Sequence, residues 1–155
     1  MSQSSSVTPT RLADFLPYLL SITSNAVSDR IADEYRAHFG LKIPEWRVMA
    51  VLGDHGAATQ RTLVEATRMD KVAVNRACRG LEERGLLVRR PNSADGRSHH
   101  LGLTSAGQDV YRAIMPMALE IEGRLFSSLS ADERALFRNL LERIRAEAEK
   151  TGHQQ

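Results

Sequence analysis

The chain has 155 residues, 42% of them hydrophobic and 26% charged, with a formal net charge of +2. This is the composition of an ordinary globular protein of one domain, or of a small module with an extension. No stretch approaches the roughly 18 apolar residues of a membrane span, and a single cysteine, Cys78, excludes an internal disulfide. The start, MSQSSSVTPT, lacks the basic and apolar regions of a signal peptide, which predicts a cytoplasmic protein with flexible ends at 1–10 and 151–155.

Positive charge is concentrated in the middle of the chain. Residues 57–103 hold nine Lys or Arg against five Asp or Glu, a local balance of +4 that leaves −2 for the remainder. Such a segment suits an anionic partner such as nucleic acid, although many solvated surfaces carry a similar imbalance.

The first two predicted elements are helices. Apolar residues recur with helical spacing from Leu12 to Tyr35, with Pro17 at or just before the regular helix and Gly40 as its end. A second helix is expected from Pro44 to about His55, because Pro44 suits a first-turn position and Gly56 follows.

Two shorter helices are expected next. Thr59 is the predicted N-cap of the first, and Asp70 begins the second, where its carboxylate suits the helix dipole. The inward residues of the first are expected to be Leu63, Val64 and Ala66. Those of the second, spaced i, i+3, i+4 and i+7, are expected to be Val74, Ala77, Cys78 and Leu81.

A hairpin and two helices complete the chain. The stretches 86–91 and 99–103 are typical of short strands joined by a polar turn. Thr104 is the expected N-cap of a helix over 105–125 that contains Pro116, and Ser130 with Glu133 predicts a capping box. The last helix carries an apolar stripe formed by Leu136, Phe137, Leu140, Leu141 and Ile144.

This order predicts a mainly α protein with a small β-hairpin, an α+β winged helix-turn-helix. The segment 59–107 carries the motifs "DK…V.R….LE..GL", "D.R" in the turn and "L.LT..G" after it. With these motifs in this order and spacing, the chain resembles the MarR family of transcriptional regulators over about 12–150. The resemblance implies a DNA-binding lobe at 44–104, flanked by dimerisation helices at 11–40 and 105–150.

The expected partner is double-stranded DNA. The helix beginning at Asp70 would enter the major groove by its N-terminal end, and the turn between the strands would approach the minor groove. The predicted DNA-binding residues are Thr59, Arg61, Asp70, Lys71, Ala73, Asn75, Arg76, Arg79, Asp95, Arg97, Ser98 and His99.

Several of these residues have distinct expected roles. Lys71 suits a phosphate contact and Arg76 suits guanine. The resemblance to the family's wing implies that Arg97 enters the minor groove. Asp95 is repelled by phosphate and is expected to orient Arg97 or another arginine such as Arg79. Lys71 and Arg76 also fit an ordinary solvated helix surface.

Other polar residues of the strands leave two interpretations open. Arg89 and Arg90 alternate across their strand, so at most one of them faces DNA. Either one of His99 and His100 contacts phosphate, or both are ordinary exposed polar residues of a strand.

The recognition helix departs from the family at Val72, Ala73 and Asn75, where the family often has small hydroxyl residues. Apolar contact with thymine methyl groups is therefore expected to contribute to base reading.

The terminal helices predict a homodimer. Their apolar stripes exceed what two lone helices bury, and a second copy would cover them in a two-fold pair; a monomeric helical cap is the alternative. The expected dimer residues are Leu12, Phe15, Leu16, Leu19, Leu136, Phe137, Leu140, Leu141 and Ile144.

The family resemblance also implies a small-molecule effector, such as an aromatic acid, a phenolic compound or a related thioester. The candidate lining residues are Asn25, Ser28, Trp46, Arg47 and Met49. Trp46 offers an aromatic wall and Arg47 a partner for a carboxylate, unless Trp46 is simply core and Arg47 a surface ion pair.

Other functions find less support in the sequence. There is no phosphate-binding loop, HExxH motif or Cys/His cluster with metal-ligand spacing, so no catalytic role, metal or cofactor is expected. Cys78 occupies an inward helix position, which favours packing over a redox role. The competing hypothesis is a winged helix that contacts only protein or RNA, which would carry an apolar or acidic recognition face.

Overall fold

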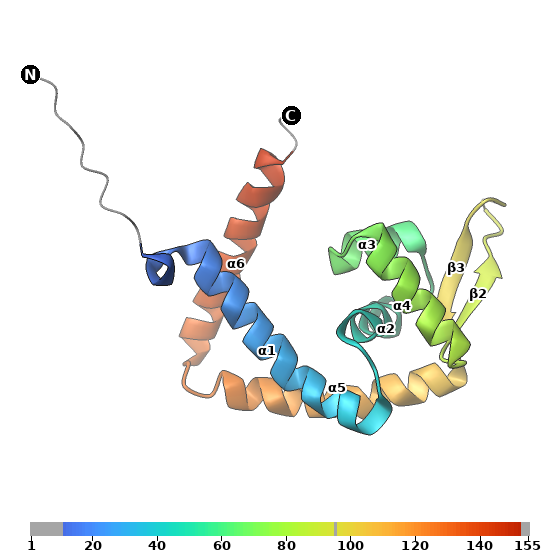
Figure 1. Cartoon of the computed structure of the whole chain (residues 1–155), viewed down its shortest axis with the longest axis horizontal. Helices are drawn as coiled ribbons and strands as arrows, with labels where there is room; N and C mark the ends of the chain where they lie inside the picture. Colours follow the sequence, from blue (N-terminus) through green and yellow to red (C-terminus); the bar gives the residue numbers. More distant parts are fainter. Residues whose placement is uncertain (1–10, 95, 153–155) are drawn as a thin grey trace, which may run out of the picture. The chain divides into compact units, whose positions relative to one another are not determined.

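The computed structural model describes residues 11–94 and 96–152, and their elements follow the predicted order (Figure 1). The elements are a 3-10 helix η1 (Leu12–Asp14), α1 (Leu16–Phe39), α2 (Ile43–His55), β1 (Ala58–Thr59), α3 (Gln60–Thr67), α4 (Lys71–Glu83), β2 (Leu87–Pro91), β3 (His99–Leu103), α5 (Ser105–Leu125) and α6 (Ala131–Thr151). The predicted mainly α fold with a small β-hairpin is confirmed. The expected flexible ends fall largely outside the described residues, except that Thr151 belongs to α6.

The chain divides into two compact units. The first ends at Met117 and the second begins at Ala118, so the boundary lies within α5. None of the helices in the described residues is long and apolar enough to cross a lipid bilayer.

Polar side chains begin the helices where the sequence predicted. The Thr59 hydroxyl accepts a hydrogen bond from the Thr62 amide at 3.2 Å, and the Asp70 carboxylate accepts one from the Ala73 amide at 2.8 Å. Ser130 forms the predicted capping box of α6. Each cap satisfies an amide that has no partner within its own helix.

The first helix begins later than its apolar spacing predicted. Phe15 has an extended backbone that separates η1 from α1, and Pro17 lies in the first turn of α1. Pro17 has no amide hydrogen to donate to the preceding turn, so it favours a new helix start over a continuous helix. The helix ends as predicted at Gly40, whose φ of 63° is left-handed.

The prediction that Ala66 of α3 faces inward is wrong. Leu63 is fully buried and Val64 is half-buried, but Ala66 is exposed. Thr67 is half-buried instead, and its hydroxyl donates to the Leu63 carbonyl at 2.6 Å and accepts from the Met69 amide.

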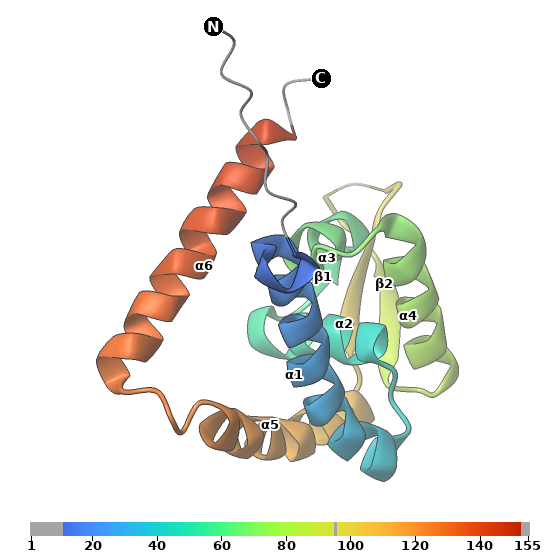
Figure 2. The ribbon, with the colours of Figure 1, turned by 60° about the vertical axis from the view of Figure 1, so that its left-hand side comes forward.

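The sheet has three antiparallel strands in the order β1-β3-β2. The predicted hairpin of β2 and β3 is confirmed, with Leu87 opposite Leu103 and Pro91 opposite His99. The sequence did not predict β1, which is only two residues long and pairs with Leu101 and His100 of β3. Figure 2 shows β2 lying beside α4.

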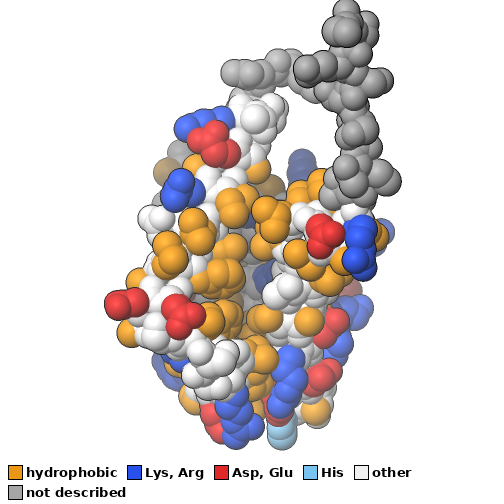
Figure 3. Space-filling view, turned by 90° about the vertical axis from the view of Figure 1, so that its left-hand side faces the viewer, with side chains coloured by type: hydrophobic (Ala, Val, Ile, Leu, Met, Phe, Trp, Pro, Cys, Tyr) orange, Lys and Arg blue, Asp and Glu red, His pale blue; other side chains and the backbone are white. Residues whose placement is uncertain are grey.

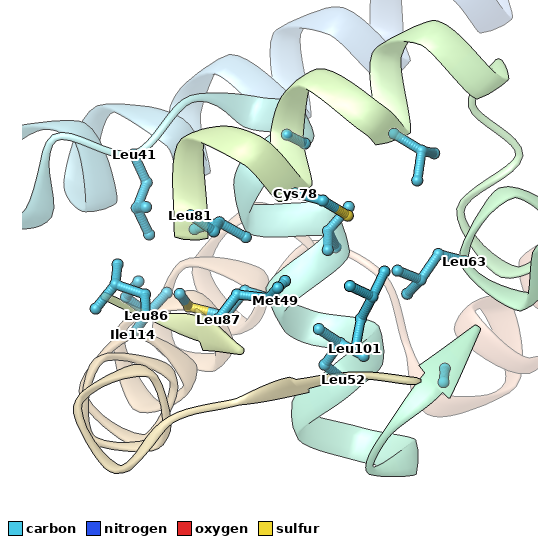
Figure 4. Close-up of a cluster of buried hydrophobic side chains, with 14 of the residues drawn as sticks. Leu41, Met49, Leu52, Leu63, Cys78, Leu81, Leu86, Leu87, Leu101 and Ile114 are labelled. Carbon is cyan, nitrogen blue, oxygen red and sulfur yellow. The ribbon is translucent and has the colours of Figure 1, made fainter. Parts of the chain in front are cut away.

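The core of the first unit lies between the sheet and helices α2, α3 and α4 (Figure 4). All four predicted inward residues of α4 are buried: Val74, Ala77, Cys78 and Leu81. The first half of α5 joins this core through Ile114. A Cβ atom on Gly53 would lie 2.6 Å from the Tyr111 ring, so this glycine allows α5 to pack closely on α2.

The second unit contains the end of α5 and α6. The Phe126 and Phe137 rings lie 6.0 Å apart, and the Arg134 guanidinium donates to the Phe126 carbonyl at 2.8 Å. These contacts fix the turn between the two helices.

Candidate nucleic-acid interface

The exposed residues of α4 are cationic apart from Val72 near its start and Glu83 at its end. Lys71, Val72, Arg76 and Arg79 are exposed, while the opposite face of the helix is buried in the core. The last three are spaced i, i+4 and i+7, so they form one stripe along the helix. This stripe begins at the N-terminal turn, the part of a recognition helix that contacts base edges.

The remaining predicted residues of α4 are less accessible. Ala73 and Asn75 are half-buried at the edge of this stripe. The Asp70 carboxylate is exposed but is engaged as the N-cap of the helix. Of the predicted residues on this stripe, Arg76 and Arg79 are therefore the exposed ones. Val72 is also exposed there, although it was absent from the predicted set.

A second polar surface lies between the start of α3 and the wing, the hairpin formed by β2 and β3. It is an open hollow of about 510 Å³, lined by Thr59, Gln60, Arg61, Arg89, Asn92, Arg97, Ser98 and His99. Five of these residues were predicted, and the structure brings all five together. Three arginines around one hollow make it suited to an anionic ligand such as a phosphate backbone.

The hollow also identifies which arginine of β2 faces this side. Arg89 lines it, whereas Arg90 lies on the other side of the sheet with His100. The Nε and Nη2 atoms of Arg89 lie 2.9 and 2.8 Å from one carboxylate oxygen of Glu82, near the end of α4. This ion pair connects the wing directly to the helix beside it, and sequence alternation alone gave no sign of it.

The turn of the wing is closed by two residues. The Asn92 amide donates to the Ser98 carbonyl at 3.1 Å, and the Asn92 side-chain nitrogen lies 3.0 Å from the Ser98 hydroxyl. Arg97, next to this closure, is exposed. The predicted role of Asp95 falls on a residue outside the described ranges.

Cys78 lies at the centre of the lobe and does not reach this surface. It is fully buried, and burial raises the pKa of its thiol from 9.0 to about 11. The nearby Arg89 opposes this rise and Glu82 adds to it. A neutral, buried thiol fits the expected packing role.

The region expected to bind an effector is built on aromatic packing. The Trp46 ring lies 5.7 Å from the Tyr35 ring and 6.1 Å from the Tyr111 ring. Burial raises the pKa of Tyr35, and the charges of Arg36 and Arg47 act in the opposite direction. Trp46 is thus half-buried in an aromatic cluster with cationic groups close to it.

The other predicted effector residues differ in their accessibility. Asn25 and Arg47 are exposed, and Ser28 is half-buried. Met49 is fully buried within the core of the lobe, so it presents no surface to a ligand. The role of Met49 in effector binding stays a prediction, and in this structure its side chain belongs to the core.

Two sets of exposed apolar side chains lie outside the lobe. In the first unit Leu12, Phe15, Leu16 and Leu19 are exposed along η1 and α1, and Leu16 is 75% exposed. In the second unit α6 exposes Leu136, Phe137, Leu140, Leu141 and Ile144. Figure 3 shows hydrophobic side chains, in orange, exposed at the surface. Large exposed apolar faces of this kind mark interaction surfaces.

Comparisons with known proteins agree with this geometry. A family model described as the MarR family matches residues 39–98. The transcriptional regulator HosA of Escherichia coli is 30% identical over 101 residues, which cover 65% of this chain and 75% of HosA.

Solved structures share the fold as well. A MarR/EmrR family transcriptional regulator from Acinetobacter sp. ADP1 superimposes with a TM-score of 0.84 at 23% identity, covering 91% of this chain and 99% of that one. BpsR of Bordetella bronchiseptica, whose DNA binding is regulated by 6-hydroxynicotinic acid, gives a TM-score of 0.75 at 25% identity, covering 84% and 98%. The motifs, the winged helix-turn-helix and these similarities lead to one conclusion: the chain belongs to the MarR family of transcriptional regulators.

Proposed function

We propose that this protein is a ligand-responsive transcriptional repressor that binds a pseudo-palindromic DNA operator as a homodimer. The observation that carries the proposal is the pairing of two cationic surfaces on one lobe. One is the exposed stripe of α4, and the other is the arginine-lined hollow at the wing.

The two surfaces suit different parts of a DNA duplex. The N-terminal turn of α4 fits the major groove, where Arg76 pairs with guanine and Lys71 contacts phosphate. Arg97 on the wing enters the minor groove, where narrow A·T-rich DNA concentrates negative potential. Thr59, Arg61 and the other residues of the hollow bind the backbone between these two contacts.

A winged helix used only for protein contacts is the alternative. Such a module would present an apolar or acidic recognition face. Here the exposed residues of the first two turns of α4 include two cations and a single hydrophobic side chain. This charge pattern favours DNA.

Dimerisation supplies the two-fold geometry. The apolar side chains of η1, α1 and α6 become buried against the same helices of a second copy. Two α4 helices and two wings then meet half-sites about one helical turn apart on the duplex. A dimer bound across a promoter blocks access of the polymerase, which is why repression is proposed.

The proposed effector is a small aromatic acid or phenol. BpsR is regulated by such a compound, 6-hydroxynicotinic acid. In this chain Trp46 offers an aromatic edge and Arg47 an exposed guanidinium, and Asn25 and Ser28 are the candidate polar groups on α1. A carboxylate paired with Arg47 while its ring lies against Trp46 fits this set.

The DNA-binding proposal is tested by titrating the protein into labelled DNA from upstream of its own gene and measuring fluorescence anisotropy. Arg97→Ala is expected to weaken binding by roughly 1–3 kcal/mol, the size of one good specific contact. Asp54→Ala, an exposed change at the end of α2, serves as the control and is expected to bind normally. Unchanged binding by Arg97→Ala, or no binding by the native protein at low salt, would contradict the proposal.

The effector proposal is tested by thermal denaturation with a panel of aromatic acids and phenols. A ligand of the folded protein raises the melting temperature by mass action. Arg47→Ala is expected to lose the shift caused by acids while keeping its affinity for DNA. A panel that leaves the melting temperature of the native protein unchanged argues against this class of effector.

A further inference from the structure

Val72 is an unusual residue for its position. Among the described residues of 43–104 it is the only large hydrophobic side chain that is exposed, and it is 60% exposed. The other exposed large hydrophobic residues of the first unit lie on or between η1 and α1, the helices proposed for dimerisation. Val72 therefore lies apart from that interface and from the core.

The surroundings of Val72 are those of a base-reading position. It is the second residue of α4, next to Lys71 and one turn before Arg76. The Asp70 cap fixes this first turn through the Ala73 amide, so the valine is held on a rigid helix start. A β-branched side chain in a helix also has one strongly preferred rotamer, which fixes where its methyl groups lie.

The major groove offers one apolar group to such a side chain. Of the four bases only thymine presents a methyl group there, at C5, and apolar side chains contact it. Arg76 and Lys71 account for guanine and phosphate, but neither distinguishes thymine from cytosine. An exposed valine beside them adds that discrimination.

We propose that Val72 is a specificity-determining residue that contacts a thymine C5 methyl group in the major groove. This inference rests on the proposed DNA-binding function. Val72 is a better candidate for the thymine contact than Ala73, because Ala73 is half-buried and carries a single methyl group.

The test uses a binding site enriched from a random double-stranded DNA library by the native full-length protein. Each thymine of the enriched site is replaced in turn by deoxyuridine, which removes only the C5 methyl group. One thymine in each half-site is expected to lose about fourfold in affinity, the size expected for burying one methyl group. Val72→Ala is expected to lose affinity for the thymine site and to become insensitive to deoxyuridine at that same position.

Two variants act as controls for this result. Lys71→Ala is expected to weaken binding to thymine and deoxyuridine sites equally, because it removes a phosphate contact and no base contact. Val72→Ile keeps an apolar β-branched side chain and is expected to remain sensitive to deoxyuridine.

The outcomes separate the inference from the function on which it rests. A library that yields no enriched sequence contradicts DNA reading itself. An enriched site that binds equally well with deoxyuridine at every position overturns the role of Val72 alone. The same follows if Val72→Ala retains the full loss at the sensitive thymine.

Discussion

At the scale of single residues, the proposed site depends on which side chains the fold keeps accessible and which it engages. Arg89 and Arg90 are neighbours in sequence, yet only Arg89 lines the hollow at the wing. The alternation of a strand predicts that they face opposite sides, but not which side carries DNA. That information comes from Glu82, whose carboxylate holds Arg89 from a different element.

The buried thiol of Cys78 predicts how the free energy of unfolding depends on pH. Its thiol pKa is about 11 in the folded chain, against an ordinary value of 9.0, so the folded state keeps the proton to higher pH than the unfolded state. This shift stabilises the folded state fully below about pH 9, and the stabilisation is lost as the pH rises toward 11. The free energy of unfolding is expected to fall by about 2–3 kcal/mol over that range. Denaturant unfolding at intervals between pH 8 and 11 measures it.

Cys78→Ala is the comparison for that series. The variant is expected to be about 1–2 kcal/mol less stable at neutral pH, because it leaves a small cavity in the core. Its free energy of unfolding is expected to fall less steeply than that of the native chain above pH 9. Parallel curves for the two proteins would mean that the buried thiol titrates normally.

At the scale of elements, the N-cap of α4 links stability to DNA binding. Asp70→Ala removes the hydrogen bond to the Ala73 amide and is expected to cost about 1 kcal/mol of stability. Asp70→Asn keeps a capping oxygen and removes a negative charge from the DNA-facing end, so it is expected to bind DNA more tightly. Thermal unfolding and anisotropy titrations of both variants test this, and weaker binding by Asp70→Asn would argue against DNA at this end of α4.

The ion pair between Glu82 and Arg89 is expected to position the wing relative to α4. Glu82→Gln releases Arg89, which then adds its own attraction to phosphate, so overall affinity alone does not report the positioning. The informative quantity is the coupling in a double-mutant cycle with Arg97→Ala. The penalty for Arg97→Ala is expected to shrink in the Glu82→Gln background.

A matched control for that cycle exists on α3. Arg61 and Glu65 form an exposed i,i+4 pair at 3.4 Å that connects no second element. Glu65→Gln is expected to leave the penalty of Arg97→Ala unchanged, because exposed helical pairs contribute little. Additive effects of Glu82→Gln and Arg97→Ala would show that the wing needs no such tether.

The helix starts and the hairpin were predictable because their signals are local. The caps at Thr59, Asp70 and Ser130 form within their own first turns, so side-chain type and spacing suffice. The short strand β1 was missed because two residues show no alternation, and its pairing partner lies in β3. Ala66 was predicted to face inward because it is more hydrophobic than Thr67. The Thr67 hydroxyl, however, donates a hydrogen bond to a backbone carbonyl.

Contacts between elements also explain what the sequence missed in the site. Arg84, at the end of α4, donates hydrogen bonds to the carbonyls of Phe39 and Gly40 at the end of α1. Glu82 reaches the wing from the same turn of α4. The last turn of α4 is thus attached to two other elements, and no local pattern indicates either attachment.

At the scale of the whole molecule, the proposed DNA binding requires two copies of the chain acting together. The apolar side chains of η1, α1 and α6 are exposed in a single chain, and their burial against a second copy is what would space two lobes for one duplex. Replacing Leu136 and Leu140 together by glutamate is expected to give monomers, because charges do not pack in an apolar interface. Sedimentation equilibrium measures the resulting mass.

The most direct test is native mass spectrometry of the full-length protein bound to its enriched DNA site. Two chains are expected on each duplex, with no substantial population of one-chain complexes when protein is limiting. The Leu136→Glu, Leu140→Glu variant is expected to yield mostly free DNA under the same conditions. The contrary result is a native complex with one chain per duplex that binds as tightly as the complex formed at saturating protein. It would contradict the proposal that two chains bind each DNA site together.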